Sequence, residues 1–193
     1  IEAAHIHSEK VAEIPDLDRI LTEGAGFRMG PFTLLDLTGL DVTHPATELI
    51  YRQFYEEPRY RPNVMLRARM EAGMLGRKTG QGFYDYSSGK QDFPVEAGYP
   101  TYDGRPVWIS KAEPEGHKVL FETISKIGGN IETSDRPSDD ALILVTPIGD
   151  DVTTTVLVQG LDPTRTLGVD TLVGFSTRRT IMTNPATQSD YRD

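Results

Sequence analysis

Apolar side chains recur at helical spacing through the first half of the chain, interrupted by glycine and proline. Ile6, Val11 and Ile14 fall on one stripe before Pro15, with polar residues between them. The pattern predicts five helices, at residues 2–13, after Asp16, at 30–40, at 45–57 and at 63–72. We therefore expect residues 1–88 to form an all-helical domain.

The predicted helix over residues 45–57 has a clear apolar face. Its members repeat at i, i+3, i+4 and i+8, and they are Ala46, Leu49, Ile50 and Phe54. We expect this face to pack inward.

The second half of the chain alternates strand and helix patterns. Strands are predicted at residues 105–110, 131–134, 141–146, 167–170 and 180–183, and helices at 114–127 and 152–159. The unbroken apolar run at 141–146 is typical of a parallel strand covered on both faces. This order predicts a small α/β domain with a parallel sheet over residues 105–193. Residues 89–104 are rich in Ser, Gly, Pro and acid, and we interpret them as a linker.

Composition excludes several classes of protein. The mean hydropathy is −0.39, no cysteine is present, and no apolar run is long enough for a membrane span. A net charge of −9 argues against a nucleic-acid partner. No signal peptide is visible in the sequence, and we expect a soluble cytoplasmic protein. The start at Ile1, without a methionine, suggests a processed chain or a fragment of a longer one.

Glycine and proline frame a short apolar segment at residues 24–41. Pro31 suits a first helical position, and Gly39 suits the end of that helix. Such a buried helix can pack tightly against a neighbour or form the floor of a ligand site, and the residues leave both open.

Three motifs together resemble the C-terminal helical domain of the NAD-dependent 3-hydroxyacyl-CoA dehydrogenases. They are MGPFTLLDLTGLD at residues 29–41, FYEEPRYRP at 54–62 and GRKTGQGFYDY at 76–86. The resemblance implies a homodimer whose helical domain closes one side of the acyl-CoA site. It also implies a parent enzyme that oxidises (3S)-3-hydroxyacyl-CoA to 3-oxoacyl-CoA in β-oxidation.

The resemblance implies roles for individual residues as well. Met29, Gly30, Pro31 and Phe32 match the segment that lines the acyl channel, although a structural role is an equal alternative. Dimer or core packing is implied for Leu34, Leu37, Leu40, Phe83 and Tyr84. The basic side chains Arg67, Arg77 and Lys78 suit the phosphates of coenzyme A, unless they form a solvated surface that pairs with acids.

No catalytic residue is expected in this chain. The family uses a His–Glu pair in its cofactor domain, and we assign His44 and His117 to capping or surface roles. His5 and His7 diverge on a helix, so no metal site is expected either. The family's asparagine contact to the substrate carbonyl would precede Ile1.

The α/β half lacks the marks of a dinucleotide site. Residues 110–116 have no glycine at the start of the turn where the pyrophosphate would approach, and Glu113 and Glu115 would face its phosphates. The strand before Asn184 resembles the strand that carries the family's catalytic histidine, with Ile181 in its place. We therefore interpret this half as the degenerate Rossmann-like domain of a duplicated member, with NAD bound outside this chain. A non-catalytic dimerisation scaffold is the alternative.

Overall fold

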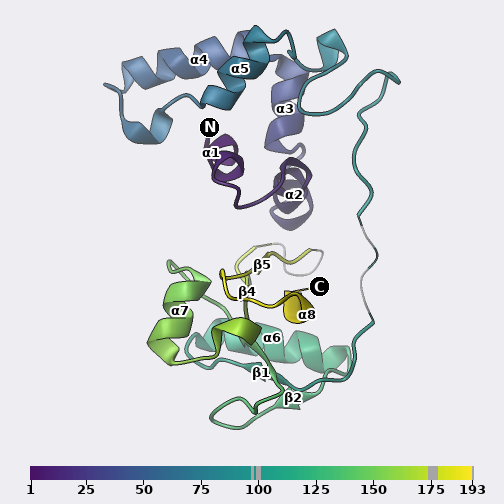
Figure 1. Cartoon of the computed structure of the whole chain (residues 1–193), viewed down its shortest axis with the longest axis vertical. Coiled ribbons are helices and arrows are strands. Elements are labelled where there is room, and N and C mark those ends of the chain that lie inside the picture. The colour runs from purple at the N-terminus through teal and green to yellow at the C-terminus, as the bar shows by residue number, and fades with distance from the viewer. Residues whose placement is uncertain (97, 99–100, 174–177, 193) are drawn as a thin grey trace. The chain divides into compact units, whose positions relative to one another are not determined.

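The computed structural model describes the chain except for residues 97, 99–100, 174–177 and 193, and divides it into two compact units (Figure 1). The units are Ile1–Glu96 and Ala97–Asp193, so the division falls inside the expected linker at residues 89–104. Among the described residues, no helix is long and apolar enough to cross a bilayer.

The first unit is helical. Its α-helices are α1 (Glu2–Ser8), α2 (Ile14–Arg19), α3 (Pro31–Thr38), α4 (Leu40–Gln53) and α5 (Val64–Glu71). Shorter helical turns lie at η1 (Ile20–Gly24), η2 (Pro58–Tyr60) and η3 (Arg77–Thr79). The helical character agrees with the sequence expectation. The side chain of Asn63 caps α5 by accepting from Met65 N.

Two helix boundaries differ from the sequence expectation. The first helix ends at Ser8 rather than at residue 13, and Lys10 has a left-handed φ of 59°. α4 begins at Leu40 rather than at Pro45. Pro45 therefore lies inside α4, where it cannot donate the backbone hydrogen bond to the carbonyl of Asp41.

The predicted inward face of α4 in fact lies outside the core of the unit. Leu49 is 57% exposed and Phe54 53%, and both Ala46 and Ile50 are also exposed. His44 lies on the opposite, buried side of the helix. The helical period was correct, but its inward direction was wrong.

The second unit contains a five-stranded sheet. Its elements are β1 (Val107–Ile109), α6 (Pro114–Lys126), β2 (Ile131–Glu132), β3 (Leu142–Val145), α7 (Val152–Gln159), β4 (Thr166–Val169), β5 (Ile181–Met182) and α8 (Ser189–Arg192). A fourth short helical turn is η4 (Pro163–Arg165). The strand order is β2-β1-β3-β4-β5, with Val107 opposite Leu142 and Leu144 opposite Leu167.

The sheet is parallel except at one edge. β5 pairs with β4 in the antiparallel sense, contrary to an all-parallel expectation. The connection at residues 170–180 explains this, because a parallel neighbour needs a crossover of about a dozen residues or more.

The two faces of the sheet are covered by different helices. Leu120 of α6 packs with one set of strand residues, and Val152 and Val156 of α7 pack with the other set. The carboxyl ends of β1 and β3 therefore lead into helices on opposite faces. This is the geometry at which open α/β sheets form a ligand crevice.

Candidate functional sites

The start of α3 is built around the buried carboxylate of Asp18 in α2. Its Oδ1 accepts from Phe32 N at 2.8 Å, and its Oδ2 accepts from Thr33 N at 2.9 Å. The Thr33 hydroxyl at 2.7 Å and the Tyr84 hydroxyl at 2.9 Å also donate to Oδ2. The carboxylate thus satisfies amide groups that a helix start leaves unpaired.

Asp18 also explains the glycine before Pro31. A Cβ added at Gly30 would lie 2.2 Å from Asp18 Cγ, so the hydrogen-bonded carboxylate would have to move. Gly30 is therefore required by the close approach of α2.

A second buried carboxylate, Asp36 of α3, holds the motif at residues 76–86. It accepts from Phe83 N and Tyr84 N, both at 2.9 Å. A Cβ at Gly82 would lie 2.1 Å from Asp36 Oδ1, and a Cβ at Gly76 would collide with the Asp36 backbone. The glycines of this motif therefore make room for Asp36.

Burial raises the pKa values of Asp36 and of two tyrosines near it. Desolvation raises the pKa of Asp36, although the amide groups of Phe83 and Tyr84 oppose the shift. Desolvation, followed by the neighbouring carboxylates, raises the pKa of Tyr84 and of Tyr86. Both phenols remain hydrogen-bond donors to the aspartates. Sequence analysis did not single out Asp18 or Asp36.

Only part of the proposed acyl-channel segment can contact a ligand. Phe32 is 0% exposed and packs edge-on against Phe83, with ring centroids 4.8 Å apart. Gly30 is also buried, whereas Met29 and Pro31 are partly accessible. The expected substrate contact of Phe32 and Gly30 is corrected to core packing, and the segment's other two residues stay candidates.

The five residues assigned to dimer or core packing separate into two groups. Leu40 is 0% exposed, Tyr84 is buried, and Phe83 packs against the core, so these three belong to the core rather than to an interface. Leu34 and Leu37 are about half exposed.

The exposed apolar residues of α3, of α4 and of the C-cap of α4 are named the apolar surface below. They are Leu34, Leu37, Val42, Leu49, Ile50 and Phe54.

The three basic residues assigned to CoA phosphates have partners within the unit. Arg67 Nε lies 2.8 Å from Glu71 Oε1, and Lys78 pairs with Asp41. Lys78 lowers the pKa of Asp41. The Arg77 guanidinium lies 5.6 Å from the centroid of the Tyr86 ring. These contacts agree with the solvated-surface alternative and leave the phosphate role untested.

Two of the histidines, His44 and His5, lie beside polar groups of the helical unit. His44 Nε2 lies 3.5 Å from Glu48 Oε1, but His44 is 2% exposed, which corrects its expected surface role. His5 Nε2 lies 2.9 Å from the Arg61 carbonyl oxygen. No group of three or more potential ligands in the described part of the chain could hold a metal.

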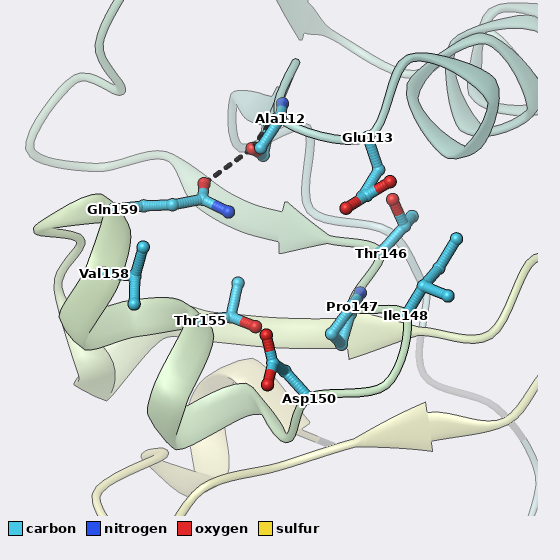
Figure 2. A pocket seen from close by; sticks show the side chains of 10 residues that line it. Ala112, Glu113, Thr146, Pro147, Ile148, Asp150, Thr155, Val158 and Gln159 are labelled. Carbon is cyan, nitrogen blue, oxygen red and sulfur yellow. Dashed lines mark hydrogen bonds between the residues drawn. The ribbon is translucent and has the colours of Figure 1, made fainter.

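In the α/β unit, a crevice opens at the carboxyl ends of β1 and β3 (Figure 2). It has a volume of 170 Å³ and is lined by residues of the β1–α6 turn, the β3–α7 turn and α7. Glu113 immediately precedes α6 without capping it through its side chain. The side chain of Asp151 caps α7 by accepting from Thr154 N at 2.7 Å.

These residues do not fit a dinucleotide. The pyrophosphate of NAD needs free helix amides and close backbone approach. Here Glu113 and Asp150 place negative charge in the crevice, and the Asp151 side chain occupies the Thr154 amide at the start of α7.

Known proteins resemble the chain most clearly in the helical unit. The family model for the 3-hydroxyacyl-CoA dehydrogenase C-terminal domain matches residues 1–86. A probable 3-hydroxybutyryl-CoA dehydrogenase of Deinococcus radiodurans is 41% identical over 85 residues, which cover 44% of this chain and 30% of that protein. The 3-hydroxyadipyl-CoA dehydrogenase of Escherichia coli K12 is 37% identical over 90 residues, covering 47% and 19% respectively.

A match to a solved structure extends over both units. The crystal structure of 3-hydroxybutyryl-CoA dehydrogenase from Escherichia coli K12 matches with a TM-score of 0.65 and 25% identity. The match covers 99% of this chain and 36% of that one. The chain thus spans about a third or less of the length of these relatives. Its helical segment, residues 1–86, belongs to the C-terminal domain family of the 3-hydroxyacyl-CoA dehydrogenases.

Proposed function

We propose that this chain is part of an NAD-dependent 3-hydroxyacyl-CoA dehydrogenase that oxidises (3S)-3-hydroxyacyl-CoA to 3-oxoacyl-CoA. The match of residues 1–86 to the family's C-terminal domain carries the proposal. The helical unit supplies the surface for dimerisation and closes one side of the acyl-CoA site. Met29 and Pro31 are its accessible candidates for contact with the acyl chain.

The α/β unit acts in this proposal as a degenerate Rossmann-like domain. Its strand order and the 99% coverage by a dehydrogenase structure support a common origin with a dinucleotide fold. Its crevice does not suit phosphates, so NAD binds in a part of the parent enzyme outside this chain. Hydride transfer and proton abstraction belong to that part too.

An activity assay tests whether hydride transfer requires a part of the parent enzyme outside this chain. The isolated chain is expected to show no NADH-dependent reduction of acetoacetyl-CoA, because the residues that the structure describes place no general base beside a cofactor site. Acetoacetyl-CoA binding, measured by calorimetry, is expected to be weak and to fall with salt if Arg67, Arg77 and Lys78 contact the phosphates. Turnover by the isolated chain would contradict the proposal.

A non-catalytic dimerisation scaffold is the second candidate, favoured by the burial of His44. The coding sequence upstream of Ile1 distinguishes the two. A strand followed by GxGxxG, and later a strand with a histidine, favours the enzyme, whereas an unrelated domain favours the scaffold.

A further inference from the structure

The segment that enters the α/β unit contains the only aspartate–glycine pair of the sequence, Asp103–Gly104. No asparagine precedes a glycine in the sequence. At such a pair the main-chain nitrogen of the second residue can attack the side-chain carboxyl of the first, because glycine has no Cβ to obstruct ring closure. The pair is therefore a candidate for spontaneous rearrangement of the backbone.

The structure leaves this pair accessible. Both residues are exposed, and they belong to neither a helix nor a strand. Gly104 has a φ of 84°, and its amide donates no hydrogen bond to any residue that the structure describes. The attacking nitrogen is thus not held by a backbone ladder.

Arg105 holds the carboxylate that would be attacked. Asp103 Oδ1 accepts from Arg105 N at 3.0 Å, and Oδ2 accepts from Arg105 Nε at 2.8 Å and lies 2.6 Å from Nη2. The Arg105 guanidinium, followed by its backbone amide, lowers the pKa of the Asp103 carboxyl. Asp190 and Tyr191 of α8 face the pair through Arg105, which donates to Asp190 O and lies over the Tyr191 ring.

We propose that Asp103–Gly104 is a site of isoaspartate formation and that Arg105 restrains the reaction. Gly104 N attacks Asp103 Cγ and loses its proton to water, while the carboxyl hydroxyl leaves as water. The resulting five-membered succinimide is opened by a water molecule. Addition at Cγ restores aspartate, whereas addition at the main-chain carbonyl carbon leaves the backbone running through Cβ and Cγ.

Arg105 slows the first step in two ways. A hydroxyl leaves more readily than an oxide, so the protonated carboxyl is the reactive form, and the lowered pKa of Asp103 keeps less of it at neutral pH. The carboxylate must also leave Arg105 N, Nε and Nη2 before Cγ can turn toward Gly104 N.

Rearrangement alters the turn that Tyr102 closes. The Tyr102 hydroxyl donates to Arg105 O at 2.6 Å and accepts from Asn130 N at 3.1 Å, so it bridges the two ends of the Asp103–Gly104 pair. Isoaspartate lengthens the main chain between Tyr102 and Arg105 by one carbon atom. The hydroxyl is then displaced from the Asn130 amide.

Incubation of the full chain at neutral pH tests the proposal, with peptide mapping by mass spectrometry and labelling by isoaspartyl methyltransferase. Isoaspartate is expected at residue 103, preceded by a species lighter by one water molecule. Arg105→Gln is expected to accelerate its formation about two- to fivefold, the factor for one lost exposed ion pair. The control Arg136→Gln removes the same charge from an exposed side chain that donates to Gln159 O, and is expected to react as wild type.

The pH profile separates the charge of Arg105 from a merely structural role. The acceleration in Arg105→Gln is expected to vanish in acid, where the Asp103 carboxyl is protonated in both proteins. An acceleration that persists in acid would overturn the assigned role of Arg105.

Asp103→Glu tests the site itself. Its longer side chain would have to close a six-membered ring, so the label at residue 103 is expected to disappear although the negative charge remains. Faster hydrogen exchange at the Asn130 amide is expected in the rearranged wild-type chain. A label that persists in Asp103→Glu, equal rates in wild type and Arg105→Gln, equal acceleration by Arg136→Gln, or unchanged exchange at Asn130 would overturn the proposal.

Discussion

At the scale of single residues, two buried aspartates decide the local structure of the family motifs. Asp18 joins α2 to the start of α3, and Asp36 joins α3 to the segment at residues 82–84. Each carboxylate accepts from two backbone amides, so its burial is offset by hydrogen bonds. The neighbouring glycines follow from these contacts.

Gly30→Ala is expected to lower the free energy of unfolding by about 2 kcal/mol or more, because its Cβ would displace the Asp18 carboxylate. Urea unfolding followed by circular dichroism measures the change. Gly24→Ala is the matched control, since nothing lies within 4 Å of its added Cβ. Equal effects of the two substitutions would contradict the close-packing explanation.

Asp36→Asn tests the raised pKa of Asp36. The native carboxyl binds its proton at a higher pH than the unfolded one, so Asp36 contributes stability that grows as pH falls from its raised pKa toward 3.8 and is lost as pH rises through that range. At pH 7 the variant has only one side-chain oxygen to accept from the amides of Phe83 and Tyr84, where Asp36 has two. The loss is expected to lower the free energy of unfolding by about 1–3 kcal/mol. The stability difference between wild type and variant is expected to widen on acidification. A difference that narrows would show a lowered pKa.

At the scale of elements, α4 turns its apolar face away from the core of its unit. Buried His44 lies on the inward side, and Leu49 and Phe54 remain more than half exposed. An exposed apolar helix face in a soluble protein usually marks an interface. It supports the proposed homodimer, in which a two-fold axis would bring the apolar surfaces of two copies together.

Leu49→Glu is expected to shift the full chain from dimer to monomer, because it places a charge on the apolar surface. Light scattering at tens of micromolar measures the mass. Gln81→Glu introduces the same charge at an exposed residue outside that surface and is expected to leave the dimer intact. A wild-type chain that is a strict monomer at this concentration would refute the homodimer.

At the scale of the whole molecule, each unit has a core of its own. Phe32 and Leu66 belong to the core of the helical unit, and Ile143 and Val145 to that of the α/β unit. The described residues at 95–104 form no helix or strand. Such a division predicts that each unit folds without the other.

Limited digestion with thermolysin is expected to cut first near Val95, which is 97% exposed, and to release two resistant fragments. Mass spectrometry identifies the cut, and circular dichroism of the purified fragments reports their folding. Cooperative thermal unfolding of each fragment is the expected result. Loss of structure in either fragment on separation would show that the units depend on each other.

The sequence by itself determined the elements and several of their ends. Helical and strand periods are local, and the capping bonds of Asn63 and Asp151 reach only two or three residues along the chain. Local pattern was therefore enough to predict a helical first half and an α/β second half. The motifs were enough to predict the family of residues 1–86.

Only the tertiary structure decided which side of each helix is buried and which groups meet. Asp18 and Tyr84 lie 66 residues apart in sequence, and Asp36 and Tyr84 lie 48 apart. From the sequence, Phe32 was a candidate for substrate contact and Leu40 for the dimer interface. Both are fully buried in the folded unit. The crevice between β1 and β3 arises from strand order, because its lining comes from turns that only the folded sheet brings together.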